Sequence, residues 1–155
     1  MVTTYMGQNN NEQQTTETLA YGMTRRWVDD GRIAIVKTQG DMSYAAIDAW
    51  ADMLIEMLND WPAGQDIAFL HDLRAPAQGL SPYARRRVMD ILAAIPDDRP
   101  TYTAILLPRT FVNRIIMMFV RTRPFRQKQH DVRVFNTQED ALAWLREHLH
   151  QARSG

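Results

Sequence analysis

The chain has 155 residues, of which 45% are apolar and 23% charged, a composition typical of one globular domain with a buried core. It contains no cysteine, which excludes disulfides, thiolate metal sites and cysteine nucleophiles. No stretch approaches the roughly 18 consecutive apolar residues of a membrane span, and the N-terminus lacks the pattern of a secretory signal. We therefore expect a cytoplasmic protein that does not cross a membrane.

The formal net charge is zero, but the charge is distributed unevenly along the chain. Residues 74–133 hold 12 Lys/Arg and 4 Asp/Glu, whereas the remainder holds 6 and 14. Such asymmetry indicates either a basic surface for an anionic partner or two oppositely charged sets that face each other in the fold.

The N-terminal 20 residues are rich in Asn, Gln and Thr, so we expect a flexible tail at 1–20, a domain at 21–150 and a flexible C-terminus at 151–155. Two β-prone runs at 24–28 and 32–37 are joined by Asp29-Asp30-Gly31, which predicts a β-hairpin.

A long helix is predicted after Ser43, because apolar residues recur there at steps of three and four. Asp48, Asp52 and Glu56 form an acidic ridge on another face of this helix, and like charges at this spacing repel. The ridge is either solvated or packed against a basic helix such as the one carrying Arg85-Arg86-Arg87, in this chain or in a partner.

Residues 67–70 are consecutive apolar residues, typical of a central strand covered on both faces. His71-Asp72 ends this strand, and Ser81-Pro82 has the residues that begin a helix. Because sites in open α/β sheets gather at the carboxyl ends of strands, this is the first place to look for function. Asp72 fits either a cap for loop N–H groups or a general base without a visible partner. Ser81 fits either a helix cap or a regulated hydroxyl.

After a further strand at 102–107, residues 111–120 are apolar nearly all round the predicted helix. This helix either packs inside the fold, forms a dimer interface, lines a hydrophobic ligand pocket or binds a membrane surface. The residues of such an apolar surface are Phe111, Ile115, Met118 and Phe119. The basic residues beyond it are Arg121, Arg123, Arg126 and Lys128.

The last strand is expected at 132–135 and the last helix after Thr137, with Leu142, Leu145 and Leu149 on one face. Strands that alternate with helices predict an α/β domain with a mixed, mostly parallel sheet of about five strands, an N-terminal hairpin and about four helices.

Most catalytic signatures are absent from the sequence. It has no glycine-rich phosphate loop, metalloprotease motif or nucleophile elbow, and its four histidines make no convincing metal set. Neighbouring residues on a strand point to opposite faces, so His71 and Asp72 do not converge. We therefore expect no enzyme, no metal and no cofactor, and the lack of a base-stacking platform argues against nucleic acid as a partner.

The strand ending in Asp72-Leu73, the helix beginning at Ser81 and the final helix with residues 141–145 together resemble the STAS and anti-sigma-factor-antagonist superfamily, especially its SpoIIAA-like branch. The likeness covers about residues 21–149 in element order. It implies a STAS-like domain that is not an enzyme and that regulates by docking to a protein partner.

In family antagonists a phosphorylatable serine begins the helix, about where Ser81 falls. Here the run is Leu80-Ser81-Pro82-Tyr83, which lacks the aspartate and glycine of the family's Asp-Ser-Ser-Gly-type signature. The resemblance implies a regulatory site at Asp72, Ser81, Arg85 and Arg86, since phosphate on Ser81 would meet the helix dipole and the arginines. The alternative is a module that binds a hydrophobic ligand or an anionic membrane surface through 111–128. A homodimer through exposed apolar area also stays open.

Overall fold

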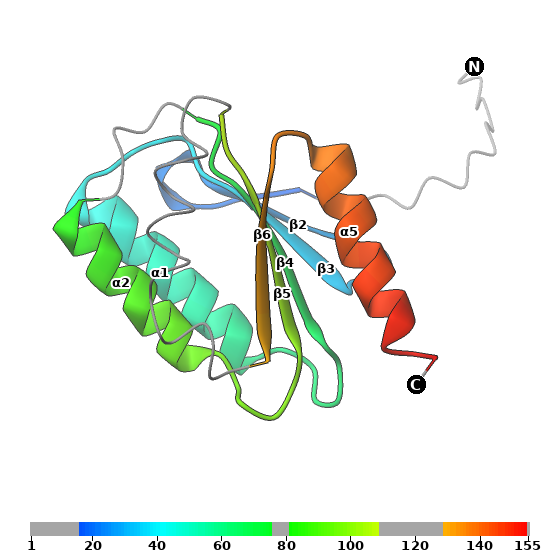
Figure 1. The fold of residues 1–155 in the computed structure, drawn as a ribbon. Helices are drawn as coiled ribbons and strands as arrows, with labels where there is room; N and C mark the ends of the chain where they lie inside the picture. Colours follow the sequence, from blue (N-terminus) through cyan, green and yellow to red (C-terminus); the bar gives the residue numbers. More distant parts are fainter. Residues whose placement is uncertain (1–15, 76–80, 109–128, 155) are drawn as a thin grey trace, which may run out of the picture.

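The computed structural model describes residues 16–75, 81–108 and 129–154. These residues form one six-stranded sheet with strand order β1-β2-β3-β4-β5-β6 (Figure 1). The strands are β1 (Glu17–Thr18), β2 (Thr24–Val28), β3 (Ile33–Lys37), β4 (Ile67–Asp72), β5 (Thr101–Leu106) and β6 (His130–Phe135). The helices are the short 3-10 turn η1 (Ala20–Gly22) and the α-helices α1 (Tyr44–Asn59), α2 (Pro82–Ala94) and α5 (Gln138–Gln151).

The pairing confirms the predicted mixed, mostly parallel sheet. The β1–β2 and β2–β3 pairs are antiparallel, whereas β3, β4, β5 and β6 pair in parallel. The hairpin turn uses left-handed backbone at Asp29, Asp30 and Gly31, with φ of 54°, 56° and 75°, which Asp and Gly tolerate.

Two counts differ from expectation. The sheet has six strands and not five, because the two-residue β1 pairs with β2 ahead of position 21, where the domain was expected to start. Its polar residues Glu17 and Thr18 carry no hydrophobic pattern that could have revealed it. The described residues contain three α-helices, and the helix expected at 111–120 lies outside them.

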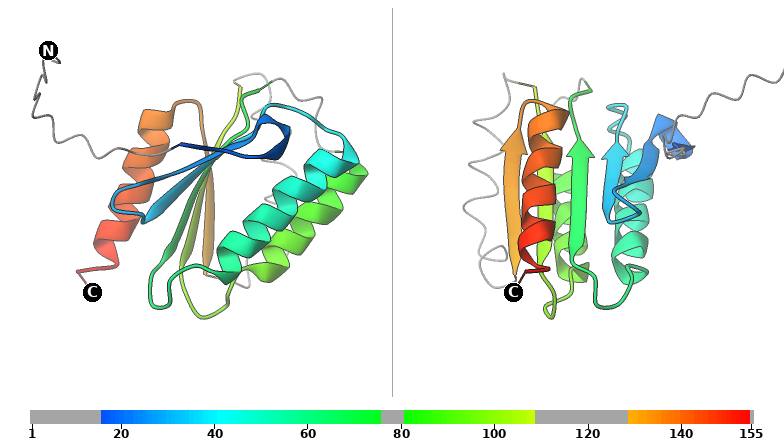
Figure 2. Two further views of the ribbon diagram at one scale, coloured as in Figure 1. Left: turned by 180° about the vertical axis from the view of Figure 1, so that it is seen from behind. Right: turned by 90° about the vertical axis from the view of Figure 1, so that its right-hand side faces the viewer.

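Helices cover both faces of the sheet: α1 and α2 lie on one face and α5 on the other (Figure 2). Side chains of β4 alternate between the two cores, which explains its unbroken apolar run. The core beside α5 contains Val28, Ile33, Ile35, Ala68, Leu70, Ala104, Leu106, Ala141, Trp144, Leu145 and Leu149. The core beside α1 and α2 contains Ala34, Val36, Leu54, Met57, Leu58, Trp61, Ile67, Phe69, Leu92 and Ile95.

The acidic ridge of α1 faces a basic residue of α2 within the chain. The Nε of Arg87 lies 3.2 Å from Asp48 Oδ1, and its Nη2 donates to Asp52. The same guanidinium also pairs with Asp90, at 2.8 Å. Two of the three ridge carboxylates, Asp48 and Asp52, are therefore offset by one arginine of the neighbouring helix, so part of the charge asymmetry is balanced within the chain. Among the helices described, none is long and apolar enough to cross a bilayer.

Candidate functional site

Asp72 ends β4 and holds the chain that follows it. Its Oδ1 accepts from the backbone N–H and the Nε of Arg74, at 3.2 and 2.9 Å, and its Oδ2 accepts from Arg74 Nη2 at 2.8 Å. Burial raises the pKa of this carboxyl, but the hydrogen bonds and charge of Arg74, together with Lys37, outweigh burial and lower the pKa below its usual value. The ionised carboxylate caps a loop N–H and binds a guanidinium, an arrangement that makes it a poor general base.

His71 precedes Asp72, and the two side chains lie on opposite faces of the sheet, as expected for neighbours on a strand. They therefore form no catalytic pair. Within the described ranges, no group of three or more His, Cys, Asp or Glu side chains is arranged to hold a metal ion.

Ser81 caps α2. Its Oγ accepts the backbone N–H of Ala84 at 3.1 Å, and Pro82 follows as the first helical residue. One orphan N–H of the first turn is thereby satisfied, while the missing donor of proline costs nothing at that position. The serine is half-buried. The N-terminus of α2, which it caps, lies at the same end of the molecule as the N-terminus of α1 (Figure 1).

Two tyrosines and two arginines gather at the N-terminal ends of α1 and α2, and we call them the tyrosine–arginine patch: Tyr44, Tyr83, Arg85 and Arg86. The rings of Tyr44 and Tyr83 stack with centroids 4.3 Å apart and planes 24° apart, and Arg86 lies 5.5 Å from the centre of the Tyr83 ring. Tyr44 is 67% exposed, and both arginines are exposed. The two tyrosines were not identified from the sequence, although Tyr44 stands off the apolar stripe of its helix.

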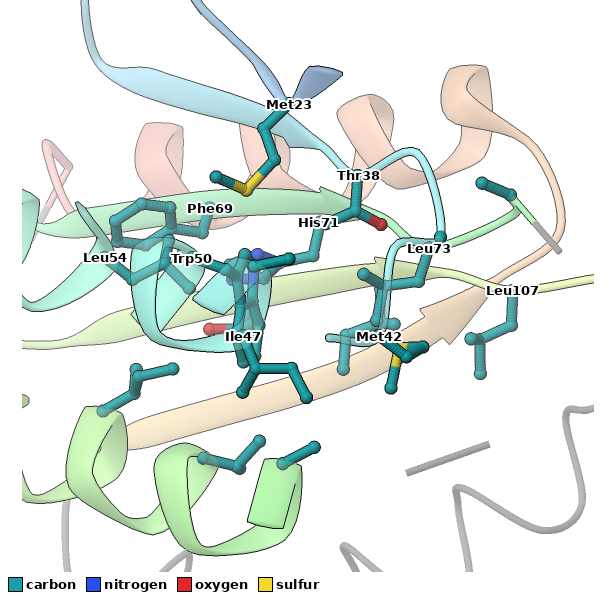
Figure 3. Close-up of a pocket in the computed structure, with 18 of the residues that line it drawn as sticks. Met23, Thr38, Met42, Ile47, Trp50, Leu54, Phe69, His71, Leu73 and Leu107 are labelled. Atoms are coloured by element: carbon teal, nitrogen blue, oxygen red, sulfur yellow. The ribbon is translucent and has the colours of Figure 1, made fainter. Parts of the chain in front are cut away.

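A pocket of about 200 Å³ lies between the sheet and the α1–α2 layer. Figure 3 shows Ile47 and Trp50 from α1 and Phe69 and His71 from β4 among its lining residues. From the sequence, His71 was weighed only as a partner of Asp72 and as a metal ligand. No other lining residue was a candidate, because these residues come from separate elements of the chain.

The remaining predicted site residues lie outside the described residues. They are the apolar set Phe111, Ile115, Met118 and Phe119, and the basic set Arg121, Arg123, Arg126 and Lys128. The hydrophobic-ligand, membrane-surface and dimer interpretations of that region remain predictions.

No protein-family model matches the chain, and no curated protein matches it. Among solved structures, it is similar to an anti-sigma factor antagonist from Mycobacterium paratuberculosis, with a TM-score of 0.52. The alignment covers 84% of this chain and 99% of that one. The chain has a STAS-type fold. This confirms the fold that the resemblance implied, and because the two sequences are only 15% identical, the likeness concerns the fold alone.

Within this STAS-type fold, Asp72 ends β4, and the N-termini of α1 and α2, with Ser81 and the tyrosine–arginine patch, follow the carboxyl ends of the parallel strands β3 and β4. Asp72 binds the loop that follows β4 and Ser81 caps α2. The patch places two arginines without a described ion pair beside the exposed ring of Tyr44 and the half-buried ring of Tyr83.

Proposed function

We propose that this chain is a non-catalytic regulatory domain that binds a protein partner through the tyrosine–arginine patch. The observation that carries the proposal is the stack of the exposed Tyr44 ring on the half-buried Tyr83 ring, with Arg86 against Tyr83. Tyrosine and arginine are enriched among the few residues that dominate binding energy in protein interfaces, and a stacked ring is already ordered before a partner arrives. The solved anti-sigma factor antagonist of the same fold supports a regulatory role.

One exposed methionine of α2 adjoins the patch. Met89 is 42% exposed and follows Arg85 by four residues and Arg86 by three, so all three lie on neighbouring positions of the helix surface. Aromatic, arginine and methionine side chains together have the composition of an interface centre.

The charge of the patch favours an acidic partner. Within the described residues, Arg85 and Arg86 make no ion pair, whereas the adjacent Arg87 is paired with three carboxylates. Two exposed cations beside Tyr44 and Met89 favour a partner that presents carboxylates to the two arginines.

The same surface supports a switch at Ser81. A phosphate on Ser81 adds negative charge at the N-terminus of α2, one turn before Arg85, where dipole and guanidinium both stabilise it. It competes with the partner's carboxylates for the arginine, so phosphorylation weakens docking.

Site-specific photo-crosslinking tests the docking surface and supplies the partner. Benzoylphenylalanine replaces Tyr44 in one sample and, in the control, the exposed Ala143 of α5 on the opposite face of the sheet. A partner that crosslinks only from position 44 is then titrated against Arg86→Glu and against Arg153→Glu, a matched charge reversal near the C-terminus. We expect Arg86→Glu to weaken binding at least about tenfold, equivalent to about 1.4 kcal/mol, and Arg153→Glu to leave it unchanged. Equal losses in both variants would show that the patch is not the interface.

Ser81→Asp tests the switch separately, because aspartate also caps helices and leaves α2 intact. It should weaken binding several-fold in the wild-type background and have no further effect in an Arg85→Ala background. An unchanged affinity in Ser81→Asp would remove the switch while leaving the docking surface in place.

A further inference from the structure

The pocket between the sheet and the α1–α2 layer is separate from the proposed docking surface. None of the four patch residues lines it. Its walls are mainly apolar and include Met23, Ile47, Leu54, Phe69 and Leu92 (Figure 3). A mainly apolar cavity with a few polar groups is the usual form of a small-molecule site.

Three polar atoms in the walls have no partner. Among the described residues, five buried side-chain nitrogen or oxygen atoms lack a hydrogen bond, and three of the five belong to residues that line this pocket. They are Trp50 Nε1 on α1, His71 Nδ1 on β4 and Thr101 Oγ1 on β5. Thr101 is only 1% exposed, so water outside the pocket cannot serve its hydroxyl. Buried polar atoms in folded proteins are normally paired, and three unpaired atoms around one cavity indicate a missing partner inside it.

The neighbouring polar groups of the same pocket show the contrast. Thr103 Oγ1 and His130 Nε2 lie 2.8 Å apart and satisfy each other. The His71 ring is held by stacking on Phe69, with ring centroids 5.4 Å apart and planes 12° apart. His71 is therefore ordered by an apolar contact while its Nδ1 has no partner.

The pocket also lacks charge to match a charged ligand. Burial and the nearby His130 lower the pKa of His71 to about 4, so this ring is neutral at pH 7. The carboxylate of Asp41, at the rim, accepts the backbone N–H of Ser43 at 2.9 Å. An ion placed among the apolar walls would lose its hydration without gaining an opposite charge, because Asp41 is exposed to solvent.

We propose that this pocket binds a small, uncharged and largely apolar molecule whose hydroxyl or carbonyl oxygen accepts a hydrogen bond from Trp50 Nε1. An indole nitrogen only donates, so the ligand must supply an acceptor. His71 Nδ1 and the Thr101 hydroxyl supply further hydrogen-bonding positions along the cavity. An apolar cavity of about 150 Å³ accepts benzene, so a volume near 200 Å³ suits a ligand of about two fused rings.

Two probes that differ in one hydroxyl test the proposal on the full chain: 1-naphthol and naphthalene. The ¹H–¹⁵N spectrum resolves the indole N–H groups of the four tryptophans, and Trp50→Phe assigns one of them. Trp61 Nε1 already donates to the carbonyl of Asp66 at 3.2 Å and serves as an internal reference. We expect 1-naphthol to shift the Trp50 indole proton downfield in a saturable way, and to bind at least about fivefold more tightly than naphthalene.

A matched pair of variants isolates the hydrogen bond. Trp50→Phe removes the donor from the pocket, and Trp144→Phe makes the same change in the core on the other face of the sheet. The preference for 1-naphthol over naphthalene should fall below about twofold in Trp50→Phe and persist in Trp144→Phe. A preference that survives Trp50→Phe would overturn the assignment of the acceptor.

Two further outcomes would overturn the site itself. One is that neither probe shifts any resonance of the pocket residues. The other is that, without a probe, nuclear Overhauser contacts join the Trp50 ring to side chains of residues 109–128, the stretch connecting β5 to β6, because the cavity would then be filled by the chain's own residues. Neither outcome bears on docking through Tyr44 and Arg86, so the two proposals fail separately.

Discussion

Replacing His71 with leucine should change how the stability of the protein depends on pH. The ring titrates at about 6.5 in an unfolded chain, whereas burial and the charge of His130 lower its pKa to about 4 in the folded protein. At a pH between these two pKa values, His71 is protonated in the unfolded state but not in the folded state. The free energy of unfolding therefore falls as the pH falls. The contribution is fully present above pH 6.5 and is lost toward pH 4.

The size of this loss follows from the two pKa values. At pH 4.5 the linkage amounts to about 2.5 kcal/mol, and the loss approaches about 3 kcal/mol below pH 4. These are upper values, because part of the His71 residue surface is exposed although its Nδ1 is buried. Leucine has a similar volume and does not titrate, so the variant escapes the loss. At pH 7 it should match the wild type within about 1 kcal/mol, since it also removes an unpaired buried nitrogen.

Urea unfolding followed by tryptophan fluorescence at pH 7 and pH 4.5 measures the effect. Carboxyl groups such as Asp72 titrate alike in both proteins, so they cancel in the difference between His71→Leu and wild type. That difference should move in favour of the variant by up to about 2.5 kcal/mol from pH 7 to pH 4.5. His150→Gln removes an exposed histidine of α5 and controls for the loss of one titrating group. A difference that stays constant within about 0.5 kcal/mol would refute the reasoning that His71 is buried in its neutral form.

Three further predictions concern stability and can be checked by the same unfolding assay. Ser81→Ala removes the cap on Ala84 and should cost about 1 kcal/mol, whereas Ser81→Asp should stay within about 0.5 kcal/mol of wild type; equal losses would mean that the Oγ contact is not a cap. Leu145 is fully buried against β5, so Leu145→Ala should cost about 2–5 kcal/mol, and a loss below about 1 kcal/mol would contradict the packing of α5. Asp29 accepts two hydrogen bonds from Arg146, at 2.7 and 2.8 Å, but the arginine is about half exposed. Asp29→Asn should therefore lower the free energy of unfolding by less than about 1 kcal/mol, and by less still in 1 M salt. A loss of stability that does not depend on salt would contradict an ionic origin.

The elements of the fold could be predicted because their signals are local. The apolar run 67–70 gave a central strand, Ser81-Pro82 gave a helix start, and Asp29-Asp30-Gly31 gave a hairpin turn. Strand β1 was missed because two polar residues carry no periodicity, and they become a strand only by pairing with β2. The acidic ridge of α1 was visible, but the sequence left open whether solvent, this chain or a partner offsets it. The structure assigns that role to Arg87 and leaves Arg85 and Arg86 exposed.

The candidate sites depended more strongly on the tertiary structure. Tyr44 and Tyr83 stack only because α1 and α2 pack with their N-terminal ends together. The pocket joins Trp50, His71 and Thr101 from three elements, and no pattern in the sequence indicates that these three residues meet.

The sequence by itself therefore determined the order of the described elements from β2 onward, the parallel sheet with its N-terminal hairpin, and the caps of the helices. These follow from periodicity and from contacts three or four residues apart. Only the tertiary structure decided which cations remain unpaired and which buried polar atoms lack a partner. Those properties depend on contacts between residues far apart in the chain, such as Arg87 with Asp52 or Thr103 with His130. A hydrogen bond is made or left unmade by the packing of whole elements, and no local pattern of residues encodes that outcome.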